Sequence, residues 1–280
     1  MAAKQIGLVD YRLENFHANV FVELLRTKLK RRGWKAAARW AMDAKGGRAW
    51  ARRKRIPFVD DVRAMADCDA LMVLAPSNPE THLRLARLAF PLGKPTYVDK
   101  TFATDLAMAR RIFRLADRYH VPVITSSALR CSASIRRLAA QVQGEKIRHM
   151  QAWGGGRSFD EYAIHPLEMV ISVLGPEVQR VCRLGNTHYH QLQLEFSGDR
   201  TASVFLHTQA ACGFHAMIST EKSTHYVNCD ADPFFQDLGS LILDFFESGR
   251  ETIDRRESLA IRAVLDAARR PEARRRFVRI

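Results

Sequence analysis

Two side chains in this sequence combine a titratable group with a position that suits proton transfer. Lys100 follows the strand-like segment 95–99, in "PTYVDK", and His165 opens an apolar helical pattern in "FDEYAIHPLEMV". A lysine at the carboxyl end of a strand, in a cleft shared with a second domain, can lose solvation, which lowers its pKa towards the useful range. A carboxylate near an imidazole fixes its tautomer and raises its basicity. Glu161 and Asp160 lie four and five residues before His165.

The spacing of the other histidines and of the cysteines argues against a metal centre. His188 and His190 alternate along a strand-like segment and could ligate a metal, but no carboxylate or cysteine partners accompany them. The five cysteines are scattered and contain no C-x-x-C pair: Cys68, Cys131, Cys182, Cys212 and Cys229. Such a set is typical of a reducing compartment rather than of a disulfide framework. The sequence therefore predicts no metal site.

Apolar segments of strand length alternate with helical patterns through the first half of the chain. The strand-like segments are residues 5–10, 36–42, 70–76, 95–99 and 122–129. Strands separated by helices imply a parallel sheet with right-handed crossovers, and ligands bind beyond the carboxyl ends of such strands. The sequence predicts an α/β fold in which residues 1–130 form a Rossmann-like, doubly wound parallel sheet, the architecture of dinucleotide-binding domains.

Two helices of this half have recognisable N-termini. Asn78 is a natural N-cap, Pro79 suits the first helical position, and Glu80 complements the helix dipole. Thr104 and Asp105 open the next helix, whose apolar residues form one stripe. These helices would follow the third and fourth predicted strands.

The pattern changes in the second half of the chain. A short helix at 132–143 precedes strand-like segments at 146–153, 188–197, 200–210 and 213–220, and two helical segments close the chain. In "HYHQLQLEF" every second residue, from His188 to Phe196, shares one apolar face, while polar residues occupy the other. This alternation marks an antiparallel sheet with one packed face. Residues 131–280 are therefore expected to form an α+β domain with a largely antiparallel sheet.

The first predicted strand runs into a turn without glycine. Where the dinucleotide-binding fingerprint G-x-G-x-x-G has its three glycines, the stretch "IGLVDYRLENFHAN" has Asp10, Arg12 and Asn15. Asp10 would place a negative charge near a pyrophosphate, Arg12 could offset it, and Asn15 tolerates a left-handed backbone. Two interpretations stay open: the turn holds a nucleotide through side chains or in a shifted pose, or the cofactor site has decayed.

The net charge of +14 gathers mainly at residues 26–55 and 268–276. Basic patches are typical of proteins that bind nucleic acid, but these lack interleaved aromatic residues and any known DNA-binding motif. We therefore expect a solvated basic surface, with an anionic substrate or cofactor as the next possibility and nucleic acid unlikely. No apolar run approaches the roughly 18 residues of a membrane span, and the N-terminus shows no signal-peptide pattern, so the expected location is the cytoplasm.

Several motifs together resemble the Gfo/Idh/MocA family of oxidoreductases. The family reads T-P-x-x-x-H, then G-K-x-V-x-x-E-K-P, then an arginine after the next strand. The corresponding residues here are Ala75, Pro76, Asn78, His82, Gly93, Lys94, Asp99, Lys100, Thr101 and Arg130. A helix followed by glycine, the "HPLE" at 165–168 and the closing helical segments keep the family's order, so the resemblance covers nearly the whole chain.

The resemblance implies roles for particular residues. Lys100 would orient or protonate the reacting carbon beside a nicotinamide, and His165 would act as acid or base on a substrate hydroxyl, with Glu161 where the family has aspartate and Asp160 one place off. The family's E-K-P is D-K-T here, which keeps the acid and the lysine but loses the proline. The implied cofactor-binding residues are Asp10, Arg12, Leu13, Asn15, Asp43, Ala75, Pro76, Asn78, His82, Asp99, Lys100 and Arg130.

The expected protein is an NAD(P)-dependent oxidoreductase that transfers hydride between a nicotinamide cofactor and a sugar, cyclitol or similar hydroxylated small molecule. Asp43 suits the free ribose of NAD, whereas Lys45 and Arg48 suit the 2′-phosphate of NADP; NAD is slightly favoured because the acid lies nearer the strand end. The alternative is a non-catalytic relative that kept the fold as a ligand-binding or scaffolding protein. The resemblance also implies that residues 131–280 form the substrate and oligomerisation domain, because the family uses the sheet of this domain for subunit contacts, and so it implies a homo-oligomer.

Overall fold

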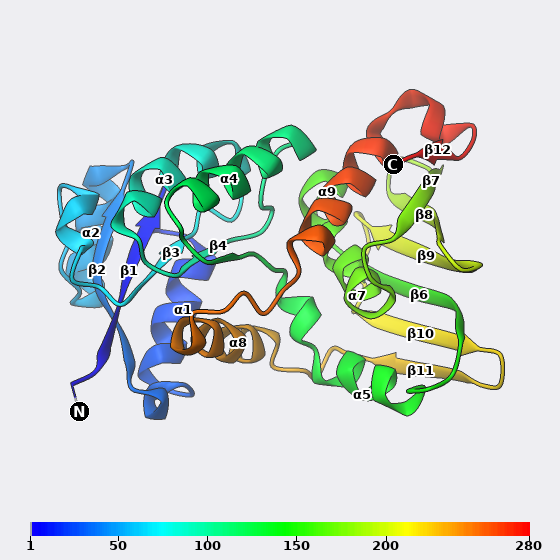
Figure 1. Ribbon diagram of the computed structural model, residues 1–280, viewed down its shortest axis with the longest axis horizontal. Helices are drawn as coiled ribbons and strands as arrows, with labels where there is room; N and C mark the ends of the chain where they lie inside the picture. Colours follow the sequence, from blue (N-terminus) through cyan, green and yellow to red (C-terminus); the bar gives the residue numbers. More distant parts are fainter. Residues whose placement is uncertain (1) are drawn as a thin grey trace. The chain divides into compact units, whose positions relative to one another are not determined.

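The computed structural model describes residues 2–280, and the chain divides into two compact units (Figure 1). Unit 1 combines the chain up to Ser126 with Phe235–Asp254, and unit 2 combines Ser127–Phe234 with Arg255–Ile280. The sequence pattern predicts two continuous domains that meet at residue 130. The structure instead returns a C-terminal segment to unit 1, so the chain passes between the units more than once.

The returning segment contains helix α8 (Phe234–Ser248), whose place is decided by side chains far away in sequence. Gly239 lies so close to Leu29 that a built Cβ would come within 2.6 Å of the leucine side chain. Arg32 holds the same helix through Asp244 and Glu247, with N–O distances of 2.7 and 2.8 Å. These contacts explain why α8 packs with unit 1, which an amphipathic pattern alone does not reveal.

Unit 1 is built on a five-stranded parallel sheet. Its order is β2-β1-β3-β4-β5. The strands are β1 (Lys4–Asp10), β2 (Trp34–Ala41), β3 (Ala70–Val73), β4 (Thr96–Val98) and β5 (Val123–Ile124). The sequence pattern predicts all five. The last is much shorter than the predicted 122–129, because Ser127 caps a 3-10 turn, Ala128–Cys131, that takes over its end.

The helices of unit 1 follow the strands in the expected alternation. They are α1 (Phe16–Arg26), α2 (Ala44–Lys54), α3 (His82–Ala89) and α4 (Leu106–Arg118), with α8 added from the C-terminal half. Asp105 caps α4 as predicted, because its side chain accepts from the Met108 N–H. Asn78 does not cap in this way: a 3-10 turn, Pro79–Thr81, precedes α3, and the Asn78 amide donates to Glu80.

Unit 2 is built on a seven-stranded sheet in which, among the described strands, only β6 and β9 run parallel. Its order is β11-β10-β6-β9-β8-β7-β12. The strands are β6 (Ile147–Gly155), β7 (Val178–Gly185), β8 (Tyr189–Phe196), β9 (Arg200–His207), β10 (His215–Thr220), β11 (Thr224–Asn228) and β12 (Val278–Arg279). In β8 the predicted alternation is confirmed: His190, Leu192, Leu194 and Phe196 are buried.

Helices cover one face of this sheet and supply its core. They are α5 (Ala133–Gln141), α6 (Phe159–Tyr162), α7 (Ile164–Leu174) and α9 (Arg255–Arg269), and a 3-10 turn, Pro271–Arg274, follows α9. Side chains of α7 and α9, such as Leu167 and Val264, join buried residues of the strands, such as Leu192, in one apolar cluster. The expected α+β class with a mostly antiparallel sheet is thus confirmed.

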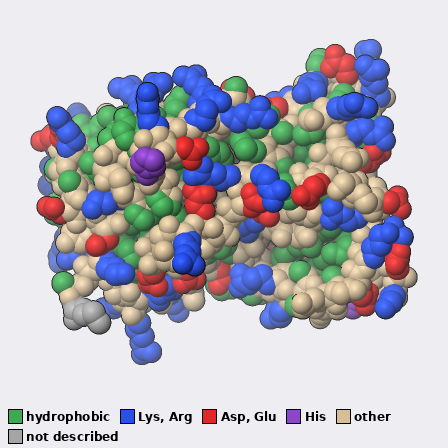
Figure 2. Space-filling view, viewed as in Figure 1, with side chains coloured by type: hydrophobic (Ala, Val, Ile, Leu, Met, Phe, Trp, Pro, Cys, Tyr) green, Lys and Arg blue, Asp and Glu red, His purple; other side chains and the backbone are tan. Residues whose placement is uncertain are grey.

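The surface is strongly basic. Figure 2 shows lysine and arginine side chains spread over the face in view, with a group around β12 and the C-terminus. Within residues 2–280, no helix has both the length and the apolar character needed to cross a membrane.

Candidate functional site

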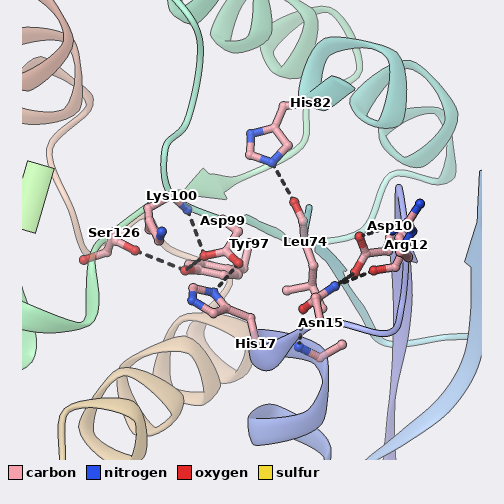
Figure 3. Close-up of polar contacts among 11 residues, drawn as sticks. Asp10, Arg12, Asn15, His17, Leu74, His82, Tyr97, Asp99, Lys100 and Ser126 are labelled. Atoms are coloured by element: carbon pink, nitrogen blue, oxygen red, sulfur yellow. Dashed lines mark hydrogen bonds and ion pairs between the residues drawn. The ribbon is translucent and has the colours of Figure 1, made fainter. Parts of the chain in front are cut away.

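The turn between β1 and α1 is closed by side chains rather than by glycine (Figure 3). One carboxylate oxygen of Asp10 accepts from the Arg12 backbone N–H at 3.1 Å, and the other accepts from the Asn15 side-chain amide at 2.8 Å. The same amide donates to the Arg12 carbonyl, while the Asn15 side-chain oxygen caps α1 by accepting from the Ala18 N–H at 2.9 Å. Leu13 is fully buried beneath the turn. A tight turn therefore forms here without positive-φ glycines.

This arrangement changes the expected effect of Asp10. The side chain is fully buried and faces the turn, so it acts first as part of the scaffold. Burial is the largest influence and raises the pKa of Asp10 to about 7, although the hydrogen bonds from Asn15 and the Arg12 backbone act in the opposite direction. Near neutral pH about half of the Asp10 side chains therefore carry a proton, which reduces the negative charge that would oppose a pyrophosphate.

A second polar cluster forms at the carboxyl end of β4, around Asp99. His17, from the first turn of α1, places Nδ1 2.5 Å from one Asp99 oxygen. The other oxygen accepts from the Tyr97 hydroxyl at 3.0 Å and from the Lys100 backbone N–H at 2.8 Å. The Tyr97 hydroxyl also lies 3.1 Å from the Ser126 carbonyl. Asp99 thereby ties the loop that carries Lys100 to α1 and to the end of β5 (Figure 3).

Electrostatics keep the Asp99 carboxylate ionised in spite of its burial. Desolvation alone would raise its pKa, but the charge and hydrogen bond of His17, together with the charge of Lys100, outweigh that effect and lower the pKa of Asp99. Lys100 itself is only 6% exposed, and the Lys100–Thr101 peptide bond is cis. The lysine predicted from sequence thus lies in a largely desolvated position beside a fixed negative charge.

His82, another predicted cofactor residue, is fully buried and contacts two backbone carbonyl groups of unit 1. Its Nε2 lies 2.6 Å from the Leu74 carbonyl oxygen, and its Nδ1 lies 3.0 Å from the Phe102 carbonyl oxygen. The imidazole therefore links the end of β3 to the loop after Lys100. Its observed contacts make it a residue that positions two loops.

The loop after β3 contains a strained backbone. Ala75 has φ of +64°, a left-handed conformation that costs a residue with a Cβ about 1–2 kcal/mol. Ala75 and Pro76 are buried, whereas Asn78 is partly exposed. The strain lies at the carboxyl edge of the sheet, where such conformations cluster in functional loops.

The end of β2 presents an acid and a cation close together. Asp43 caps α2 by accepting from the Gly46 N–H at 3.0 Å, and a Cβ on Gly46 would collide with the Asp43 carboxylate. The Arg12 guanidinium lies 3.8 Å from the other Asp43 oxygen, and the two side chains are 62% and 37% exposed. Arg48, in contrast, is paired with Asp60.

In unit 2 the predicted His165 lies in a continuous polar network. Its Nδ1 is 2.6 Å from the Ser127 hydroxyl, and the Ser127 backbone N–H donates to Glu168 at 2.8 Å. Glu168 also accepts from Arg130 Nε at 2.8 Å, and Arg130 Nη1 donates to Glu257 at 2.6 Å. The Glu168 and Glu257 carboxylates flank the buried Arg130 guanidinium, so two ion pairs compensate its positive charge.

Of the two carboxylates expected beside His165, Asp160 pairs with a different residue. Asp160 forms an ion pair with Arg269 at 2.8 Å, and the Glu161 backbone N–H donates to Ser158 as part of the α6 cap. The observed partner of His165 Nδ1 is a serine hydroxyl that sequence spacing did not indicate. Glu168, three residues further along the same helix face, joins the network through Ser127.

The predicted residues therefore form three groups. In unit 1 the structure brings together Asp10, Arg12, Asn15 and Asp43 at the first two strand ends, and Asp99 and Lys100 at the fourth. In unit 2 it joins His165 and Arg130 through Ser127 and Glu168. In the described part of the chain no three or more His, Cys, Asp or Glu side chains are grouped to hold a metal ion.

Sequence reasoning missed His17, Tyr97, Ser127 and Glu168. His17 lies just after the glycine-free turn that follows the first strand. Its contact with Asp99 forms only because α1 packs on the sheet, so the sequence alone does not reveal it. Tyr97 and Asp99 are two residues apart and point to one side of an extended segment, a spacing that could have indicated their contact. Ser127 carried no comparable signal.

The fold and these polar clusters define a protein of two units, one with a Rossmann-type parallel sheet and one with a mixed, mostly antiparallel sheet. Residues 15–127 match the family model GFO_IDH_MocA, described as an oxidoreductase family with an NAD-binding Rossmann fold. This match over unit 1 agrees with the family resemblance that the motifs of the sequence predicted. No curated protein sequence matches the chain.

Solved structures resemble the chain over its whole length. GenD2 from gentamicin A biosynthesis, in complex with NAD, has a TM-score of 0.83 at 14% identity and covers 100% of this chain and 97% of its own. Scyllo-inositol dehydrogenase from Lactobacillus casei, with NAD(H) and scyllo-inositol, has a TM-score of 0.81 at 14% identity, with 99% of each chain covered. A probable dehydrogenase from Thermotoga maritima has a TM-score of 0.84 at 13% identity, with 98% of each covered. At these identities the likeness establishes the shared fold.

Proposed function

We propose that this protein is an NAD-dependent dehydrogenase that acts on a hydroxylated small molecule such as a sugar or cyclitol. The observation that carries the proposal is Lys100: a desolvated lysine at the carboxyl end of β4, held by the ionised Asp99. The match of residues 15–127 to an NAD-binding oxidoreductase family supports it, as does the shared fold with an inositol dehydrogenase.

The residues at the first two strand ends fit a dinucleotide. Arg12 offers an exposed guanidinium beside the N-terminal turn of α1, where phosphate groups bind favourably. Asp43 keeps its carboxylate partly exposed at the end of β2, where an acid accepts from ribose hydroxyls. Arg48 is paired with Asp60 and so is less available for a 2′-phosphate. This donor set favours NAD over NADP, although the exposed Lys45 keeps NADP as the alternative.

A bound nicotinamide would supply the hydride acceptor or donor. Lys100 would transfer a proton to or from the substrate hydroxyl, and Asp99 would hold the lysine loop in position through the Lys100 backbone N–H. His165 is the second acid–base candidate, and the Ser127 hydroxyl at 2.6 Å holds its ring orientation. Asp160 is paired with Arg269 and is not assigned to the proton transfer, whereas Glu161 stays the proposed carboxylate partner of His165.

A non-catalytic relative is the competing function, and two observations favour it. Both ring nitrogens of His82 contact backbone carbonyl groups, and Arg130 is paired with Glu168 and Glu257. These contacts occupy the polar groups that the two expected cofactor residues would need for a ligand. A protein of this kind would keep the fold as a scaffold and would not bind nicotinamide cofactors.

Cofactor binding separates the two functions. We expect NADH to bind with enhanced nicotinamide fluorescence and partial quenching of tryptophan emission. Arg12→Ala should weaken NADH binding by about 1.5–3 kcal/mol, as expected for the loss of a hydrogen bond to a charged group. Arg118→Ala, at an exposed arginine in the last turn of α4, is the matched control. A wild-type protein that does not bind NADH or NADPH at millimolar concentration supports the non-catalytic function.

A further inference from the structure

A small pocket lies in unit 2 at the end of β7, and none of its lining residues belongs to the candidate functional site. It has a volume of about 170 Å³ and is lined by Arg183, Leu184, Gly185, Asn186 and Arg274. This volume is well below the roughly 300–1,000 Å³ of pockets that enclose drug-sized ligands. The pocket therefore suits a single small group rather than a whole nucleotide.

Within the described part of the chain, both cations of this pocket lack acidic partners. Among these residues neither Arg183 nor Arg274 forms an ion pair. Asp160, whose charge reaches Arg183, is itself paired with Arg269 at 2.8 Å. Two guanidinium groups that line one cavity without a directly paired acid repel each other, and an anion between them would remove that cost.

Neighbouring side chains hold the Arg183 guanidinium in a defined position. Its guanidinium carbon lies 3.8 Å from the centroid of the buried Phe159 ring, and its Nη2 donates to His190 Nδ1 at 3.2 Å. Phe159 also meets the His190 ring edge-on, with centroids 5.3 Å apart. One face and one nitrogen of the guanidinium are thus fixed inside the protein, and the other N–H groups remain for the pocket.

The charges of the two pocket arginines affect the neighbouring His190. Burial is the main cause that lowers the pKa of His190, and Arg183, Arg274 and His188 lower it further. The pKa of Arg183 is lowered by burial and by Arg274. A neutral imidazole is consistent with Nδ1 accepting from Arg183.

The backbone around the pocket is also held in place. Gly185 has φ of +99°, and a Cβ there would collide with the Tyr189 carbonyl oxygen. The Asn186 side-chain oxygen accepts from the His188 and Tyr189 N–H groups at 2.9 and 3.0 Å. Arg274 ends the 3-10 turn whose Ala273 is fully buried. Figure 2 shows basic side chains gathered at this end of unit 2.

We propose that this pocket binds one phosphate group, with Arg183 and Arg274 as its two cationic donors. A guanidinium fork matches the oxygens of a phosphate in a bidentate arrangement, and a dianion compensates both arginines at once. The phosphate can be inorganic or the phosphoryl group of a small metabolite, and both share this chemistry. The inference does not depend on the proposed dehydrogenase activity.

Isothermal titration calorimetry on the full chain tests the site, with sodium phosphate, sodium sulfate and glucose 6-phosphate as probes and sodium chloride at equal ionic strength as the reference. We expect one phosphate to bind per chain, and Arg274→Gln to weaken its affinity by about tenfold or more. Arg275→Gln, at the neighbouring exposed residue outside the pocket, should change the affinity less than twofold. Tighter binding of glucose 6-phosphate than of phosphate would identify an organic phosphate as the ligand.

Two results would overturn the proposal: heats no larger than with chloride, or an equal loss of affinity in Arg275→Gln and Arg274→Gln, which would indicate a diffuse basic surface. NMR of the histidine ring protons gives an independent check. Phosphate should raise the pH at which His190 titrates, because it offsets the repulsion from both arginines, and Arg274→Gln should reduce that change. Arg274 is exposed, so its variant is expected to fold even if substitution of Arg183 disturbs the Phe159 contact.

Discussion

Asp10 illustrates how a single buried side chain can take over the work of a glycine-rich turn. Its two oxygens hold the Arg12 backbone and the Asn15 side chain, so the backbone turns sharply without leaving the conformations that ordinary residues adopt. The cost is a desolvated carboxyl group, which explains why its pKa rises to about 7.

The raised pKa predicts how stability depends on pH. Between the unfolded value near 3.8 and the folded value of about 7, the native state binds one more proton at Asp10 than the unfolded state. The stabilisation is therefore fully present below about pH 3.8 and is lost as the pH rises through about 7. Relative to Asp10→Asn, which cannot titrate, the wild-type protein should lose roughly 4 kcal/mol of unfolding free energy over this range, at about 1.4 kcal/mol per pKa unit.

Urea unfolding of both proteins at several pH values measures this difference, and the remaining titratable groups cancel in the comparison. Asp10→Asn also places an amide N–H₂ against one of the two donors, which adds a penalty that does not vary with pH. Parallel stability curves for the two proteins from pH 4 to 8 would show that Asp10 keeps its ordinary pKa.

Lys100 carries the mechanistic prediction at this scale. If it transfers a proton in the chemical step, Lys100→Ala should lower turnover by about 10²–10⁴-fold, the usual contribution of a general acid or base. NADH affinity should change much less, because only interactions formed in the transition state affect the rate of chemistry. Steady-state kinetics on a substrate found in a polyol and sugar screen, with NADH titrations alongside, would measure both effects.

Lys222→Ala, in an exposed loop, controls for the loss of one positive charge. Near-normal turnover of Lys100→Ala on an active substrate contradicts the assigned role, whatever the outcome of the cofactor titration. A wrong role for Lys100 can therefore be told apart from a failure of the protein to bind the cofactor.

At the scale of elements, β2 contains an unusual buried cation. Arg39 is fully buried, and its three guanidinium nitrogens have no hydrogen-bond partner among the described residues. The guanidinium carbon lies 4.5 Å from the centroid of the Trp50 ring of α2, a cation–π contact that offsets only part of the desolvation cost. Burial, with repulsion from Arg26, lowers the pKa of Arg39 to about 9.

Replacing this cation should stabilise unit 1. Arg39→Met keeps a long side chain against Trp50 and removes the buried charge, so we expect the free energy of unfolding to rise by about 1–3 kcal/mol at pH 7. Chemical denaturation measures the change. The gain should shrink as the pH rises above about 9, because the native wild-type protein then loses the Arg39 proton before the unfolded chain does. A destabilised Arg39→Met protein would mean that the charge has a partner in solution.

At the scale of the whole molecule, the open face of the unit 2 sheet presents aromatic side chains to its surroundings. The rings of Trp153, His215 and Tyr226 stack with centroids 5.3–5.9 Å apart, and Tyr226 and Tyr189 are 56% and 44% exposed. Exposed aromatic residues of this kind are enriched at the centres of protein interfaces. This face is our candidate for subunit contact.

We therefore expect a homodimer or larger assembly in solution. Light scattering at micromolar concentration should give at least twice the 31.9 kDa mass of the chain. Tyr226→Glu should shift the assembly towards monomer, because it buries an unpaired charge in the contact, whereas Tyr119→Glu, at an exposed tyrosine of unit 1, should not. A monomer mass for the wild-type protein contradicts this prediction.

Local patterns in the sequence are sufficient to predict much of this protein. The Asp105 cap, the alternation along β8 and the run of strand and helix patterns in the first half depend on neighbours within a few residues, so the order of amino acids alone reveals them. The same holds for the family motifs around Lys100, which keep their order and spacing along the chain. Strands β7 and β11 escape such prediction because their apolar alternation is weak and their partners decide their conformation.

Only the tertiary structure decided which distant residues meet. It assigned α8 to unit 1 through Gly239 and Arg32, placed His17 against Asp99 across 82 residues, and gave His165 a serine partner 38 residues away. It also buried Asp10 and Arg39 and so altered their pKa values. The physical reason is that burial and long-range hydrogen bonds depend on packing between elements, whereas caps and periodicity depend on the backbone of one element alone.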